Sequence, residues 1–159
     1  MESDRLLVLY PQKRGPEKAR ERVDEVLKEA LDGINAEIVE DMDFLEQDPY
    51  RYRGRRLLFV VPLGKNGINR GYYEVLAWLR GGDQVLAGAT AGMIIDAESE
   101  FYTKATAREL AVAANRAGCA FVGRPLVEGT ASLDNYLIQA ANMNTDRFGA
   151  YKKSAAILT

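Results

Sequence analysis

The apolar run LLFVVP, residues 57–62, is the feature that most constrains the fold of this chain. A strand with one face in water alternates apolar and polar side chains, and this run contains no polar residue. Continuous hydrophobicity over so short a run indicates a strand that is buried on both faces. Strands of that kind are typical of parallel sheets with helices on either side, so the run predicts an α/β fold.

Strand and helix patterns alternate along the rest of the chain. Apolar runs predict further strands at residues 6–10, 34–39, 93–95 and 120–122, and helical spacing predicts helices at 16–31, 73–79, 103–117, 133–141 and 150–158. The polar stretch from residue 40 to residue 56 predicts a loop with a helical turn at most. Alternation of this kind predicts a three-layer α/β/α sandwich around a five-stranded parallel sheet.

Length and charge are those of an ordinary globular domain. The chain has 159 residues and a formal net charge of −2, so we expect one domain over residues 1–159. This charge gives no general reason to expect binding to nucleic acid or to an anionic membrane. The first residues do not resemble a secretory signal, and no apolar run approaches the roughly 18 residues of a membrane span. We therefore expect a cytoplasmic protein.

The counts of two reactive residue types exclude several kinds of catalysis. Histidine is absent, which removes Ser-His-Asp and Cys-His mechanisms and the commonest zinc ligand. The one cysteine, Cys119, cannot form an intramolecular disulfide and fits a reducing compartment. It lies at a predicted helix-to-strand junction, which is typical of a buried, inert thiol.

Three loops follow predicted strands at the edge where open parallel sheets bind ligands, beyond the carboxyl ends of the strands. They cover residues 11–15, 63–71 and 96–102. The glycines of the second loop form neither a Walker loop nor a GxGxxG fingerprint, so they provide no nucleotide motif. Arg124, after the last predicted strand, either points a guanidinium at an anionic group in the same crevice or is an ordinary surface residue.

The sequence VVPLGKNGINRGYYEVLAWL, residues 60–79, resembles the third strand, loop and helix of flavodoxin-like NAD(P)H-dependent FMN reductases. Pro62 at the strand end, Gly67 in the loop and Trp78 in the helix match that outline. The resemblance implies a flavodoxin-like fold with strand order 2-1-3-4-5, FMN as cofactor and NAD(P)H as electron donor. It also implies that Tyr102 flanks the flavin ring and that the loop contacts it through Pro62, Leu63, Gly64, Lys65, Asn66, Gly67 and Ile68.

The loop after the first strand departs from the flavodoxin pattern. Flavodoxins hold the FMN phosphate in a loop rich in serine and threonine at a helix N-terminus, whereas this loop reads PQKRGPEK and contains neither. Lys13 and Arg14, preceded by Gln12, replace hydroxyl groups by charge, and an arginine fork suits a phosphate well. Two solvated basic residues in a surface turn would give the same sequence, so both interpretations stay open.

The loop after the fourth strand carries three carboxylates within five residues, at Asp96, Glu98 and Glu100. Carboxylates there would repel a reduced anionic flavin, bind a cationic or polyhydroxyl ligand, or transfer protons if one of them is buried. Alternatively, Glu98 and Glu100 open the next helix and complement its dipole. Asp96 directly follows a buried strand, so it is the acidic residue that we favour for the site, and Glu98 is retained beside it.

Three hypotheses follow. In the first, the chain is an FMN-binding NAD(P)H-dependent oxidoreductase, in which Lys13 and Arg14 anchor the phosphate. In the second, it keeps the fold, has lost FMN, and serves as a small-molecule-binding or regulatory interaction module. A third hypothesis is a hydrolase or transferase that uses Asp96 or Glu98 as a base. The resemblance also implies a homodimer, whose surface we place on the aromatic helix around residues 72–78.

Overall fold

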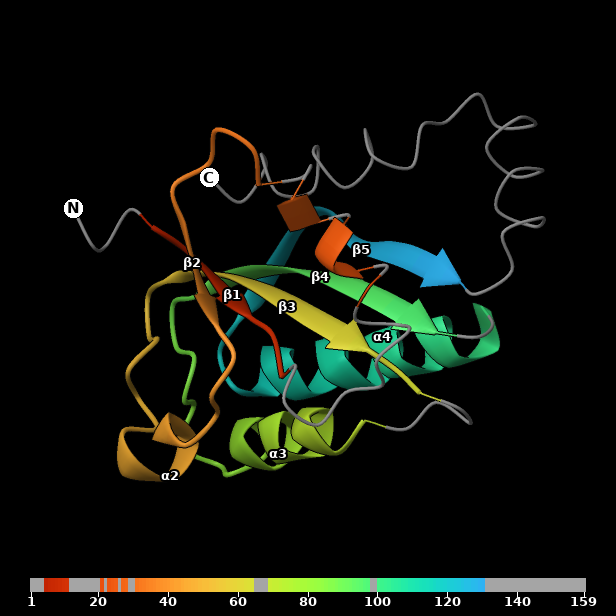
Figure 1. The fold of residues 1–159 in the computed structure, drawn as a ribbon. Helices are drawn as coiled ribbons and strands as arrows, with labels where there is room; N and C mark the ends of the chain where they lie inside the picture. Colours follow the sequence, from red (N-terminus) through yellow and green to blue (C-terminus); the bar gives the residue numbers. More distant parts are fainter. Residues whose placement is uncertain are drawn as a thin grey trace.

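The computed structural model describes residues 5–11, 21, 23–25, 27–28, 31–64, 69–97 and 100–130, with residues 100 and 122–130 described by their backbone only. Five parallel strands form one sheet in this part of the chain, in the order β2-β1-β3-β4-β5 (Figure 1). The strands are β1 (Leu6–Leu9), β2 (Ala36–Val39), β3 (Arg56–Pro62), β4 (Thr90–Ala97) and β5 (Ala120–Thr130). This arrangement confirms the predicted α/β class and the order 2-1-3-4-5.

Helices cover both faces of the sheet. The helices α2 (Phe44–Gln47), α3 (Arg70–Leu79) and α4 (Glu100–Arg116) lie on one face, with α3 and α4 side by side (Figure 1). Alternate residues of the central strands, such as Phe59, pack against them. Val60 faces the other way and packs with Val23 and Leu27, which belong to the helical residues described between positions 21 and 28. The predicted three layers are therefore confirmed.

The apolar run at residues 57–62 belongs to β3, the central strand of this sheet. Residues 57–61 are each at most 2% exposed, and β3 pairs with β1 on one side and β4 on the other. The prediction of burial on both faces is confirmed. Because β1 has β2 on one side and β3 on the other, the strand order reverses between β1 and β3, which is the switch point of the sheet.

The fourth strand is longer than predicted. It covers Thr90–Ala97 instead of residues 93–95, and it pairs with β3 without a break from Thr90 opposite Arg56 to Asp96 opposite Pro62. The small residues Ala91 and Gly92 give little local strand signal, so pairing with β3 sets the length of β4. The prediction that Asp96 follows the strand is wrong, because Asp96 lies inside it.

The fifth strand also extends beyond its predicted end at residue 122. It runs to Thr130, and its register on β4 shifts between the pair Ala91–Phe121 and the pair Met93–Leu126. The chain therefore bulges at residues 122–125. Pro125 reads as a strand end in the sequence, but an edge strand tolerates proline at a bulge. The prediction that Arg124 follows the last strand is wrong, because it lies within β5.

The helices begin earlier than their apolar spacing predicts. α3 begins at Arg70 and α4 at Glu100, three residues before the predicted starts at 73 and 103 in both cases. The predicted helical turn in the polar loop is the four-residue helix α2. The predicted helices at 133–141 and 150–158 lie outside the described residues. Within the described residues, no helix combines the length and the apolar character needed to cross a membrane.

Candidate functional site

The carboxyl ends of β1, β3 and β4 meet at one edge of the sheet, which also contains the switch point. The structure describes five of the predicted site residues, at the ends of β3 and β4 and in the first turn of α4: Pro62, Leu63, Gly64, Asp96 and Tyr102. The other predicted site residues lie outside the described residues: Gln12, Lys13, Arg14, Lys65, Asn66, Gly67, Ile68 and Glu98. The structure therefore gives the base of this site and the points from which its loops leave.

Asn69 joins the end of β3 to the start of α3. Its Nδ2 donates to the carbonyl oxygen of Pro62 at 2.7 Å, and its Oδ1 accepts from the backbone N–H of Tyr72 at 3.1 Å. The side chain is 1% exposed. Extended backbone angles and a bond to the third amide beyond it make Asn69 the N-cap of α3. This role of Asn69 was not predicted from the sequence, although an asparagine just before a helical pattern is a known start signal.

Gly71 brings α3 against the end of β1. A Cβ atom on Gly71 would lie 2.6 Å from Cβ of Pro11 and 3.3 Å from the carbonyl oxygen of Pro11. Only glycine allows the helix to approach the chain this closely. The end of β1 is held from its other side by the backbone N–H of Tyr10, which donates to the carbonyl oxygen of Val39 in β2 at 2.9 Å. The start of α3 is thus fixed against both strands that flank the switch point.

Asp96 occupies a different place from the one predicted. It lies in β4 opposite Pro62, its side chain is 0% exposed, and its carbonyl oxygen accepts from the backbone N–H of Leu63 at 2.7 Å. Because side chains alternate along a strand, Asp96 shares a face with Ile94, the face opposite α3 and α4. Its contact with a ligand stays a prediction, and the carboxylate does not project from the edge into solvent.

Two aromatic residues follow β4 in the first turn of α4. Tyr102 is half-buried and packs against the core on the α3 side of the sheet, while Phe101 is 76% exposed. Their ring centroids are 5.5 Å apart in an edge-to-face arrangement. The structure therefore holds the Tyr102 ring from one side. Phe101, which sequence analysis did not single out, is the more exposed of the two.

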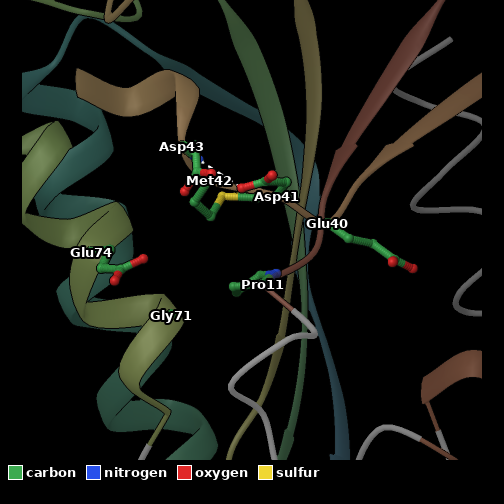
Figure 2. A pocket seen from close by; sticks show the side chains of 7 residues that line it. All are labelled: Pro11, Glu40, Asp41, Met42, Asp43, Gly71 and Glu74. Atoms are coloured by element: carbon green, nitrogen blue, oxygen red, sulfur yellow. Dashed lines mark hydrogen bonds between the residues drawn. The ribbon is translucent and has the colours of Figure 1, made fainter. Parts of the chain in front are cut away.

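A small pocket opens beside the switch point, between the ends of β1 and β2 and the start of α3 (Figure 2). Its lining consists of Pro11, Glu40, Asp41, Met42, Asp43, Gly71 and Glu74. The pocket has a volume of about 40 Å³, whereas sites for drug-sized ligands enclose roughly 300–1,000 Å³. Four of the seven residues are acidic, and the Glu40 side chain extends away from the others (Figure 2). This pocket alone is too small for an organic cofactor.

The acidic residues do not form a metal centre. Among the residues that the structure describes, no group of three or more His, Cys, Asp or Glu side chains is placed to hold a metal ion. In the pocket, the backbone N–H of Asp43 donates to the Asp41 carboxylate at 3.0 Å, so one carboxylate oxygen already has a partner within its own turn.

Cys119 behaves as predicted from the sequence. It is 3% exposed, and burial raises the pKa of its thiol to about 12. A thiol with such a pKa stays protonated at neutral pH and is a poor nucleophile. Cys119 directly precedes β5, at the sheet edge opposite the candidate site. The prediction of a buried thiol is confirmed, and its raised pKa agrees with an inert one.

The aromatic helix α3 does not offer the surface that we placed on it. Tyr72 and Trp78 are 2% and 7% exposed and belong to the core, while Tyr73 alone of the three is about half exposed. The placement of a dimer surface on these rings is therefore wrong for Tyr72 and Trp78. Tyr72 bonds to Glu109 of α4 and Trp78 packs against Phe44 of α2, which is the ordinary inward role of residues at helical spacing.

Comparison with known proteins identifies the fold. No family model matches the chain, and no curated protein matches its sequence. An NADH:FMN oxidoreductase in its apo form is similar in structure, with a TM-score of 0.59 and 14% identity over 94% of this chain and 88% of that one. A short-chain flavodoxin associated with a bacterial microcompartment also has a TM-score of 0.59 and 14% identity, over 97% and 95% of the two chains. The fold of this chain is flavodoxin-like.

Proposed function

We propose that the carboxyl edge of this sheet binds FMN and that the chain is a flavin-dependent NAD(P)H oxidoreductase. The observation that carries the proposal is a fold shared, over 94% and 97% of this chain, with an NADH:FMN oxidoreductase and a flavodoxin. In open parallel sheets the ligand lies beyond the carboxyl ends of the strands, near the switch point. Among the residues predicted from the sequence, Pro62, Leu63 and Gly64 are described and lie at that edge.

The described residues of this edge fit a flavin. Pro62 and Leu63 are buried and form an apolar base, and Gly64 is the first residue of the segment with part of its surface in solvent. A glycine at this point lets a planar ring approach the backbone. Asp96 is fully buried within β4, so its carboxylate does not project from this edge into solvent.

In this proposal each loop has a separate task. Lys13 and Arg14 bind the phosphate as charged donors, and residues 65–68 lie along the flavin ring. Tyr102, which the core already holds on one side, flanks the ring. FMN, when bound, supplies the hydride chemistry, while the protein orients the ring and excludes water from it. No histidine or reactive cysteine is needed for that chemistry.

A second candidate function is ligand binding without FMN. It is favoured by the loop sequence PQKRGPEK, which has no hydroxyl side chain for a phosphate. It is also favoured by the four acidic residues of the pocket beside Pro11, because negative charge near the end of β1 disfavours a phosphate there. In this case the chain would be a binding or regulatory module with the same fold.

The test is a visible absorbance spectrum of the purified protein, before and after incubation with excess FMN and desalting. It is repeated with a Lys13→Ala, Arg14→Ala double variant. Arg108 and Arg116 are exposed on α4, so the double variant Arg108→Ala, Arg116→Ala removes the same charge elsewhere and serves as control. We expect a flavin spectrum that survives desalting in the control and is lost in the Lys13, Arg14 variant. NADH or NADPH, added without oxygen, should then bleach the bound flavin.

Each other outcome has a defined meaning. A colourless protein that releases all added FMN would overturn the proposal and leave the second candidate. Retained flavin that is unaffected by the loss of Lys13 and Arg14 would place the phosphate elsewhere. Retained flavin that neither nicotinamide reduces would keep the cofactor and remove the oxidoreductase assignment.

A further inference from the structure

We propose that Asn69 is a positioning residue of this site, which fixes both ends of the β3–α3 loop for ligand binding. The inference rests on the proposed function, because it concerns the same edge of the sheet. It adds a residue that contacts no flavin and acts through the loop that does.

Asn69 makes two bonds of different kinds. Helix capping needs only an acceptor, and Oδ1 supplies it to the backbone N–H of Tyr72 at 3.1 Å. Serine, threonine or aspartate would cap α3 as well. The second bond, from Nδ2 to the carbonyl oxygen of Pro62 at 2.7 Å, is the shorter one and plays no part in capping. Only a side chain with both a donor and an acceptor, of this length, makes both bonds.

The second bond closes the loop. It joins the last residue of β3 to the residue before α3, with residues 63–68 between them. The Asn69 side chain is 1% exposed, so water does not compete for the bond. A loop whose ends are held loses less conformational freedom when a ligand orders it. The bond therefore prepares the loop for binding.

Asn69 and Pro11, the last described residue after β1, both lie close to Gly71. A Cβ atom on Gly71 would be 3.3 Å from Oδ1 of Asn69 and 2.6 Å from Cβ of Pro11. The segments that leave β1 and β3 therefore meet at the first turn of α3. A change at Asn69 that shifts this turn should also shift Pro11 and Pro62, from which the two loops leave the sheet.

The experiment separates loop closure from helix capping. Asn69→Ser keeps a good N-cap but is too short to reach Pro62. Trp78→Phe is the matched control, because Trp78 lies near the other end of the same helix. Its Nε1 donates to the carbonyl oxygen of Pro49 at 2.9 Å, so this variant also loses one bond from a side chain to a backbone carbonyl. Both variants and the wild type are compared as full chains for FMN dissociation constant and unfolding free energy.

A second readout does not depend on FMN. Lys65 lies in the loop that the bond closes, so the rate at which the endoproteinase Lys-C cuts after Lys65 in the native protein reports opening of that loop. We expect Asn69→Ser to weaken FMN binding roughly five- to tenfold and to speed this cleavage by about the same factor, the value of one buried hydrogen bond. Trp78→Phe should leave both readouts within about twofold of wild type while it lowers stability to a similar degree.

Equal FMN affinity and equal cleavage in Asn69→Ser and wild type would overturn the inference. Equal losses in Asn69→Ser and Trp78→Phe would also overturn it, since that result shows a general effect of stability. If the wild type binds no FMN, the proposed function fails, while cleavage after Lys65 still decides whether Asn69 closes the loop. If Asn69→Ser does not fold, Asn69→Asp replaces it, because aspartate keeps the cap and places an acceptor against the Pro62 carbonyl.

Discussion

The two ends of α3 are held in different ways. At its C-terminal end, Trp78 packs edge-to-face against Phe44 with ring centroids 5.8 Å apart, and Phe44 packs against Tyr52 at 4.8 Å. At its N-terminal end, directional contacts dominate: Asn69 bonds to the end of β3, and Gly71 touches Pro11. The first end lies toward the amino edge of the sheet and the second lies at the candidate site.

This difference separates stability from position. Aromatic side chains contribute free energy in proportion to the apolar area that they bury, and they tolerate small shifts. Hydrogen bonds and backbone contacts at close distance contribute less energy but fix geometry within tenths of an ångström. We therefore expect changes at the aromatic end to lower stability with little effect on ligand binding. Changes at the other end should cost less stability but weaken ligand binding.

The largest effect is expected for Trp78→Ala. Removing a buried tryptophan leaves a cavity beside Phe44 and should lower the unfolding free energy by about 3–5 kcal/mol. Urea unfolding measures the loss. Tyr73→Ala, on the same helix but with a ring 48% exposed, is the control and should cost under about 1 kcal/mol. A loss below about 1 kcal/mol for Trp78→Ala would contradict the assignment of stability to this end.

A smaller effect is expected for Gly71→Ala. The added methyl group meets Pro11 at 2.6 Å, and overpacking of this kind costs about 1–3 kcal/mol. Alanine recovers about 1 kcal/mol as the better helix former, so the net loss should be about 0–2 kcal/mol, with weaker FMN binding because the end of β1 must move.

The control for this prediction is Ala77→Gly. Ala77 is exposed on the same helix, so the exchange measures the helix preference without a contact. Gly71→Ala could instead stabilise the protein by as much as Ala77→Gly destabilises it. Pro11 would then move aside at no cost, and close contacts would not fix the N-terminal end of α3.

Local apolar runs were sufficient to predict the five strands and the α/β class, while the strand order came from the family resemblance. The run at residues 57–62 is apolar throughout, which is typical of an interior strand of a parallel sheet, buried on both faces. The end of β4 could not be predicted, because pairing of Asp96 with Pro62 sets it and the sequence around Asp96 does not. β5 likewise continues beyond Pro125, because its pairing with β4 and not the local sequence sets where it ends.

The candidate site was predicted less completely than the fold. The position of Asn69 just before a helical pattern indicates that it starts a helix. Its bond to Pro62, however, depends on where β3 ends in space. Gly71 was considered only as part of a nucleotide motif, and its contact with Pro11 joins residues 60 positions apart. Contacts of this kind depend on packing between elements, which no local pattern encodes.

The smallest effect is expected for Tyr72→Phe, at the candidate-site end of α3. The hydroxyl of Tyr72 donates to Oε1 of Glu109 in α4 at 2.9 Å, so its removal should cost about 0.5–1.5 kcal/mol at neutral pH. Burial, and then the bond to Glu109, raises the pKa of Tyr72 above its usual value of 10.0. Above pH 10 the unfolded chain releases this proton while the folded chain keeps it, so the unfolding free energy of the wild type falls as pH rises.

The phenylalanine variant has no such proton, so the stability advantage of the wild type should shrink as pH rises from about 9 to 11. Urea unfolding of both proteins across that range measures the difference. Burial also raises the pKa of Cys119 to about 12, but this thiol is present in both proteins and its contribution cancels. Parallel stability curves would mean that the Tyr72 hydroxyl meets water in the folded state. The N-terminal end of α3 would then be loosely packed around Tyr72. The contrast between the two ends of the helix would rest on Asn69 and Gly71 alone.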